Sequence, residues 1–185
     1  NNISGTSDLA PLDQQAAMIQ EMFPNAKTVG LLYCSAEPNS VYQCDVIEGY
    51  LTEMGLETTR YAFTDTNDVT SVTQAAAAAS DVIYIPTDNT AASNTEAIAN
   101  VTVPAKTPVI AGEEGICKGC GVATLSISYY DLGMTTGKMA AKILTGEADI
   151  STMPIEFTTA TPKYNASMCE TLGITPLEGY TAIAE

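Results

Sequence analysis

Short apolar runs alternate along the chain with stretches in which apolar residues recur at helical spacing. The run Val82–Ile85 is rich in β-branched residues and is bounded by polar ones, which is typical of a strand buried on both faces. Pro86 ends this run, and the polar residues Thr87–Thr90 favour the start of a helix. The same reasoning predicts strands at residues 28–33, 57–63, 82–85, 107–111, 122–127 and 155–159, and helices at residues 12–23, 41–54, 69–79, 90–100, 131–145 and 165–172.

The regular alternation of strands and helices predicts an α/β fold with a doubly wound parallel sheet and helices on both faces. In such a sheet the carboxyl ends of the strands meet at one edge, and ligands bind just beyond it. Polar turns follow the predicted strands and gather at this edge, at residues 35–40, 64–68, 86–90 and 112–115. Asp8 and Asp131 are the expected caps of the first helix and of the helix at 131–145.

Asp88 has two interpretations at this edge. It caps the helix that follows, or it faces the crevice and accepts from an ammonium or hydroxyl group of a ligand. The other polar side chains at the edge are hydroxyls, amides and carboxylates, which suit the holding of a small polar ligand rather than its transformation. The full set of candidates is Ser35, Asn39, Ser40, Asp88, Asn89 and Glu114.

The composition further limits the functions and partners that are expected for this chain. The formal net charge is −15 and the chain contains no histidine. An acidic surface repels nucleic acid and anionic membranes, so no polynucleotide partner is expected. No apolar run is long enough to span a membrane. The chain starts without a charged and apolar leader, so the protein is cytoplasmic or a leader has been removed.

Signatures of cofactor binding and catalysis are missing from the sequence. There is no glycine-rich nucleotide loop, so no cofactor is expected, and a serine triad cannot be built in its usual form without histidine. Glu113 and Glu114 form a carboxylate pair that could do acid–base work. The alternative, which we favour because no acid–base partner is identifiable, is that the adjacent side chains diverge. We therefore expect a binding protein and not an enzyme.

The five cysteines include one close pair, Cys117 and Cys120. This spacing fits a redox pair or half of a zinc site, but zinc would need two more ligands and no second pair is present. Two glycines beside the pair predict a turn, so we favour a structural disulfide or two free thiols in a loop, and no metal site. The remaining cysteines lie in apolar contexts and are expected to pack as small apolar side chains.

Four blocks of sequence, taken together, resemble a known family. Val29–Ser40, Tyr84–Asn89, Val109–Gly115 and Tyr130–Leu144 are similar, in order and spacing, to the ABC-transporter substrate-binding proteins that include tryptophan- and phenylalanine-binding members. The resemblance covers nearly the whole chain. It implies an exported protein of the periplasmic-binding-protein type I class, whose ligand lies between two flavodoxin-like lobes and is gripped as they close.

The resemblance also implies an organisation into domains. The family's members are usually longer, so the chain looks like a fragment that lacks most of the first lobe. On this interpretation residues 1–8 are a hinge or linker segment and residues 9–111 belong to the second lobe. Residues 112–150 are a hinge crossing and a strand–helix excursion into the first lobe, and residues 151–185 return to the second lobe. One lobe supplies half of the ligand contacts, so weak or no affinity is expected for the chain by itself.

Site roles follow from the resemblance residue by residue. Ser35, Asn39 and Ser40 would hold a carboxylate at a helix N-terminus. Asp88, with Asn89 beside it, would take an α-ammonium group. Glu114 would touch the ligand or control closure at the second hinge, and Tyr130 would line the cleft from the first lobe. An exported location would favour a Cys117–Cys120 disulfide.

The resemblance implies partners as well. The ligand is expected to be an amino acid or a related small polar molecule, and the partner of the full-length protein an ABC permease, with the protein periplasmic or lipid-anchored on the outer face of the membrane. On this interpretation the helix at 131–145 lacks the first-lobe sheet on which it would pack. It would therefore favour a domain-swapped homodimer of this chain. The alternative function is a stand-alone flavodoxin-like sensor or enzyme domain that uses Asp88, Glu113 and Glu114.

Overall fold

The computed structural model describes residues 2–184 as two compact units. Unit 1 comprises the chain up to Ala10 together with Ile127–Thr161, and unit 2 comprises Pro11–Ser126 together with the chain from Pro162 onward. The chain therefore passes between the units near residues 10, 126 and 161. The lobe boundaries expected for this chain from the sequence, at residues 8, 111 and 150, stay a prediction.

A seven-stranded sheet in the order β3-β2-β4-β5-β6-β8-β9 forms the centre of unit 2, and the strand pairs β2–β3, β2–β4, β4–β5, β5–β6 and β8–β9 are parallel. This confirms the α/β class and the largely parallel sheet. Its strands are β2 (Thr28–Cys34), β3 (Glu57–Phe63), β4 (Val82–Ile85), β5 (Val109–Ala111), β6 (Ala123–Ile127), β8 (Ala160–Tyr164) and β9 (Thr181–Ala182). Its helices are α1 (Leu12–Met22), α2 (Pro38–Glu53), α3 (Val69–Ala79), α4 (Asn89–Ala92), α5 (Thr95–Ala105), α6 (Glu114–Cys120) and α8 (Ala166–Leu172).

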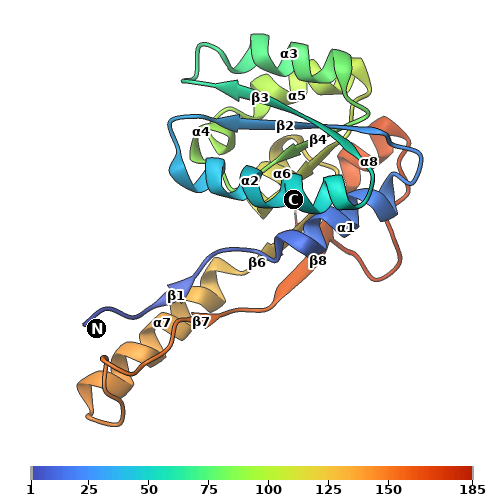
Figure 1. Cartoon of the computed structure of the whole chain (residues 1–185). Coiled ribbons are helices and arrows are strands. Elements are labelled where there is room, and N and C mark those ends of the chain that lie inside the picture. Colours follow the sequence, from blue (N-terminus) through green and yellow to red (C-terminus); the bar gives the residue numbers. More distant parts are fainter. Residues whose placement is uncertain (1, 185) are drawn as a thin grey trace. The chain divides into compact units, whose positions relative to one another are not determined.

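Helices cover both faces of this sheet, as Figure 1 shows for α1 and α2 on one side and α3 and α5 on the other. The central strands β2, β4 and β5 are buried almost throughout, because both faces are covered. On the α3, α5 and α6 face, side chains such as Ile83 and Ile85 pack with Val69, Ile98 and Ile116. On the other face the Tyr84 hydroxyl donates to Oε1 of Gln15 in α1 at 2.6 Å.

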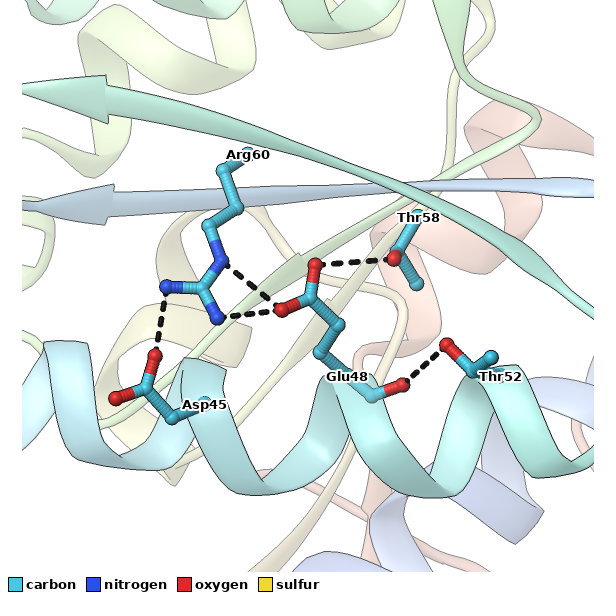
Figure 2. Close-up of polar contacts among 5 residues, drawn as sticks. All are labelled: Asp45, Glu48, Thr52, Thr58 and Arg60. Atoms are coloured by element: carbon cyan, nitrogen blue, oxygen red, sulfur yellow. Dashed lines mark hydrogen bonds and ion pairs between the residues drawn. The ribbon is translucent and has the colours of Figure 1, made fainter.

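The edge strand β3 is tied to α2 by a cluster of charged and polar side chains (Figure 2). Arg60 pairs with Asp45 at 2.7 Å and donates through Nε to Glu48 at 3.1 Å, while Thr58 Oγ1 donates to the second Glu48 oxygen at 3.1 Å. The hydrogen bonds to Glu48 raise the pKa of Arg60 further above its usual value. The cluster puts charge on the sheet's open edge, which discourages pairing with another strand.

Replacing Arg60 by methionine is expected to lower the free energy of unfolding by only about 1 kcal/mol or less, because partly exposed ion pairs contribute little. The Arg60 side chain keeps 33% of its exposure and Asp45 keeps 56%. Chemical denaturation of both proteins in low and high salt measures the effect, which should shrink as salt rises. A loss of several kcal/mol would show that the cluster is a core feature.

Unit 1 is built from a short parallel pair of strands and one long helix. β1 (Thr6–Ser7) pairs with β7 (Glu156–Phe157), and α7 (Tyr129–Leu144) follows the capping residue Ser128. The Thr6 and Thr136 hydroxyls share a hydrogen bond of 2.7 Å, which joins β1 to α7. Met139 is the buried residue of α7, so this helix has little of a core to pack against within the unit. No helix within residues 2–184 is both long and apolar enough to cross a membrane.

Most predicted elements are confirmed, but the helix at 90–100 is interrupted. α4 ends at Ala92 and α5 begins at Thr95. Ser93 Oγ donates to the Asn89 carbonyl at 2.9 Å and Asn94 Nδ2 to the Thr90 carbonyl at 2.7 Å. These side chains bond to backbone carbonyls of α4 and compete with continuation of the helix.

Several smaller expectations at element ends are wrong. Ser128 and not Asp131 caps α7, since its hydroxyl accepts from the Asp131 N–H at 3.2 Å. Asp8 does not cap α1, whose N-cap position is Pro11 without a side-chain bond. The segment 1–8, expected to be a linker, contains β1. The strand expected at 155–159 is shortened to β7, and β8, which follows it, was not predicted.

Candidate functional site

The strand order reverses between β2 and β4, because β2 continues to β3 on one side and β4 continues to β5 on the other. In open α/β sheets such a switch point, at the carboxyl ends of the strands, is the usual place for a ligand. The turn after β2 leads into α2, and the turn after β4 leads into α4. The candidate site therefore begins with the residues of these two turns.

Asp88 joins the two turns from a buried position. Its Oδ1 accepts from the Ala91 N–H at 2.8 Å, which caps α4, and its Oδ2 accepts from the Cys34 N–H at the end of β2 at 2.7 Å. The side chain is 1% exposed. The capping interpretation of Asp88 is confirmed, whereas its contact with a ligand ammonium group stays a prediction.

The start of α2 holds the peptide groups of Thr87. Asn39 Nδ2 donates to the Thr87 carbonyl at 2.8 Å, and Ser40 Oγ approaches the same oxygen at 3.4 Å. The Thr87 N–H donates to Gln43 Oε1 at 3.0 Å. Ser35 is exposed, and its hydroxyl donates to the Phe63 carbonyl at 3.2 Å. The structure thus brings Asn39, Ser40 and Asp88 together around one turn, and the ligand roles of these residues and of Ser35 remain predictions.

Glu37 is a residue of this edge that the sequence did not single out. Its Oε2 accepts from the Asn89 backbone N–H and from Asn89 Nδ2, each at 2.9 Å. Its Oε1 accepts from the Thr90 N–H at 2.8 Å and from Thr90 Oγ1 at 2.7 Å. Burial alone would raise the pKa of Glu37, but the hydrogen bonds from Asn89 and Thr90 outweigh it and lower the pKa to about 2.

The neighbouring carboxylates Glu113 and Glu114 diverge, as favoured from the sequence. Glu113 caps α6 by accepting from the Gly115 N–H at 2.7 Å and from the Ile116 N–H. Glu114 forms an ion pair with Lys163 Nζ of β8 at 2.6 Å. The two groups therefore do not form an acid–base pair, which weakens the enzyme alternative. Contact of Glu114 with a ligand stays a prediction.

Tyr130 belongs to unit 1, where it lies on α7 and is 76% exposed. Its role in ligand binding stays a prediction.

The cysteine pair Cys117 and Cys120 lies on a helix and not in a turn, and both thiols are free and buried. Of the two alternatives favoured from the sequence, the structure has two free thiols rather than a disulfide, and it places them on a helix rather than in a loop. Glu113 caps α6 at its start. The residues of α6 that pack in the core stabilise the helix despite its two glycines. Among residues 2–184 no group of three or more potential ligand side chains could hold a metal ion.

All five thiols are free and buried, so they are expected to react very slowly with a thiol reagent in the folded protein. Burial raises the pKa of Cys44 and of Cys120 to about 12, and it also raises the pKa of Cys117 and Cys169, so little reactive thiolate forms at these four residues near neutral pH. Titration without reductant should find five thiols per chain after unfolding, since all five cysteines are free. Recovery of fewer thiols, or rapid labelling of the native protein, would contradict the structure.

Comparison with known proteins gives consistent matches over nearly the whole chain. A family model described as ABC transporter substrate binding protein matches residues 1–184. A "Tyrosine-binding protein" from Clostridioides difficile (strain R20291) is 31% identical over 147 residues, which is 80% of this chain and 43% of that protein.

Solved structures agree with this result. An ABC domain from Streptococcus pneumoniae in complex with L-Trp is 31% identical, with a TM-score of 0.87 over 97% of this chain and 63% of its own. A ligand-free, open substrate-binding protein with adhesive properties from Clostridium difficile is 32% identical, with a TM-score of 0.81 over 97% of this chain and 62% of its own. The chain thus spans less than two thirds of the length of these relatives.

Proposed function

Because this chain belongs to the family of ABC transporter substrate-binding proteins, we propose that it forms part of a solute-binding protein that delivers an amino acid to an importer. The observation that carries the proposal is the likeness to a relative in complex with L-Trp and to a tyrosine-binding relative, at 31% identity in both cases. We propose an aromatic L-amino acid as the ligand. The proposed function is binding of the amino acid without its chemical conversion.

The carboxyl edge of unit 2 supports this role. Its turns present hydroxyl, amide and carboxylate groups on a buried parallel sheet, which is a rigid base for small polar ligands. We assign the carboxylate of the amino acid to Ser35, Asn39 and Ser40 at the start of α2, and its ammonium group to Asp88 and Asn89. Glu114 and Tyr130 complete the proposed set, as a closure residue and a wall of the aromatic pocket.

A thermal-shift and calorimetry screen tests the proposal on the intact gene product and, in parallel, on this 185-residue chain. L-Trp, L-Tyr and L-Phe are compared with L-Asp, L-Lys, nucleosides and small sugars. A ligand that binds the native state raises the melting temperature by mass action. We expect a shift with the aromatic amino acids in the intact protein and a much weaker one in this chain. Failure of the intact protein to bind any amino acid would refute the function.

The same proposal places the intact protein outside the cytoplasm, either in the periplasm or held by a lipid anchor on the outer face of the membrane. Its partner there is an ABC permease. Protease accessibility of the protein on intact cells or spheroplasts tests this location, and protection until the membrane is lysed would contradict it.

We further propose that this chain, by itself, associates with a second copy through unit 1. Large apolar side chains exposed on this unit include Leu144 at 87% and Phe157 at 66%. Others on the unit are Ile3, Tyr130, Met134 and Ile155. Apolar surface exposed in this way favours association, by docking or by exchange of the strand–helix piece.

Light scattering over a wide concentration range is expected to show dimers of this chain. The variant Phe157→Glu, which puts a charge on the exposed surface of β7, should shift the equilibrium to monomer. The control Tyr50→Glu alters an exposed aromatic residue of unit 2 and should leave the dimer intact. A strict monomer at all concentrations would refute the association.

A further inference from the structure

Resting on the proposed function, we propose that Glu37 is a positioning residue of the ligand site, which holds the turn after β4 in its binding conformation. Glu37 stands at the N-cap position of α2 but makes no side-chain bond to its own helix. Its carboxylate reaches instead to Asn89 and Thr90 at the start of α4. It therefore joins the two sides of the switch point between β2 and β4.

The hydrogen bonds of Glu37 use the whole acceptor capacity of its carboxylate. An ionised carboxylate offers about four lone-pair sites. Oε2 takes two donors from Asn89, and Oε1 takes two donors from Thr90. All four donors are protein groups, so no acceptor site remains for a ligand ammonium group. This is why the geometry points to positioning and not to direct contact.

Glu37 also sets the orientation of the Asn89 side-chain amide. With Asn89 Nδ2 donating to Glu37, the amide oxygen of Asn89 is directed away from that bond and can accept from a ligand. The turn itself is held from the other side, where Asn39 binds the Thr87 carbonyl and Asp88 binds the Cys34 N–H. Without Glu37, the first residues of the short helix α4 lose their acceptor and this end of the turn is released.

The decisive variant is Glu37→Gln, which is isosteric but has one acceptor oxygen. In this variant the NH₂ group of the glutamine replaces one of the two accepting oxygens. It would therefore face either the two donors of Asn89 or the two donors of Thr90, to which it cannot hydrogen-bond as an acceptor. A turn that is ordered for only part of the time lowers the apparent affinity by its ordered fraction, equally for every ligand. We therefore expect the dissociation constants of the intact protein for L-Trp and L-Tyr to rise together, by about tenfold or more, which corresponds to about 1.4 kcal/mol.

The matched control is Glu48→Gln. Glu48 also accepts from a neighbouring threonine and from charged nitrogen atoms, at Thr58 and Arg60, but it lies in the middle of α2 (Figure 2). This variant should change ligand affinity by less than about twofold, within the usual effect of a partly exposed ion pair. The comparison separates loss of position at the site from general loss of stability.

Hydrogen exchange provides a readout that needs no ligand. In the Glu37→Gln variant the backbone amides of Asn89 and Thr90 should exchange faster than in the wild type, and in Glu48→Gln they should not. Unchanged exchange at these amides, or unchanged affinity of Glu37→Gln for both amino acids, would overturn the inference. Loss of affinity for only one of the two would overturn it as well, since it would indicate a direct contact. Absence of amino-acid binding by the wild-type intact protein would instead refute the proposed function.

Discussion

Replacing Asp88 by alanine is expected to lower the free energy of unfolding by about 2–4 kcal/mol, which corresponds to a fall in melting temperature of about 5–15 °C. Two losses combine in this variant. Removal of the cap frees the Ala91 N–H at the start of α4, and the Cys34 N–H at the end of β2 is left buried without its acceptor. An unsatisfied buried N–H costs about 1–3 kcal/mol, in addition to about 1 kcal/mol for the cap.

The matched control is Asp68→Ala. Asp68 occupies the N-cap position of α3, but its side chain makes no capping bond and is exposed. This variant should change stability by no more than about 0.5 kcal/mol. Denaturant titration of the three proteins without ligand measures both effects. If Asp88→Ala were as stable as Asp68→Ala, the buried bridge from Asp88 to β2 would be wrong, and the ligand interpretation of Asp88 would be the stronger one.

Much of the fold could be predicted because the strands of a parallel sheet that is buried on both faces are continuous apolar runs in the sequence. Val82–Ile85 is such a run, and all of its residues are buried. The helices α2 and α3 were also predicted, since their apolar residues recur at helical spacing and face the sheet. The edge of polar turns followed from the sheet, because the carboxyl ends of its strands coincide.

The helix α6, where the sequence analysis predicted a turn, shows where this reasoning fails. Two glycines and a cysteine pair suggested a turn, since glycine weakens a helix by about 1 kcal/mol. The buried residues Ile116, Cys117 and Cys120 have helical spacing, and their packing on the sheet outweighs that cost. The signal was present in the sequence, although the stretch is short.

The role of Glu37 could not be predicted, because its partners lie more than fifty residues away. A glutamate directly before Pro38 at the start of a helix suggests a local cap. Only the pairing of β2 with β4 brings the start of α2 next to Asn89 and Thr90. Candidates such as Asn39 and Asp88 were found by their place after a strand, but their bonds to each other's turns depend on the same tertiary contact.

Replacing Gly112 by alanine is expected to destabilise unit 2 by about 2–4 kcal/mol, at or above the upper end of the usual cost of overpacking, which is about 1–3 kcal/mol. Gly112 follows β5, and its N–H donates to the Ile85 carbonyl at 2.7 Å. A Cβ atom there would lie 2.7 Å from the Pro86 carbonyl carbon and 2.8 Å from the Thr87 nitrogen. These neighbours are backbone atoms that cannot rotate away, so the two strand ends must separate.

The separation would also disturb the candidate site, because Thr87 carries the carbonyl that Asn39 binds. We therefore expect Gly112→Ala to lose ligand affinity in the intact protein along with stability. Gly49→Ala is the matched control: Gly49 lies inside α2 with nothing within 4 Å of its would-be Cβ, so alanine should stabilise the protein by about 0.5–1 kcal/mol. Equal melting temperatures for the two variants would show that β4 and β5 do not approach as closely at Gly112 as the structure has them. Opposite shifts, with a loss of ligand affinity in Gly112→Ala alone, would support the close approach of these strand ends beside the Thr87 turn.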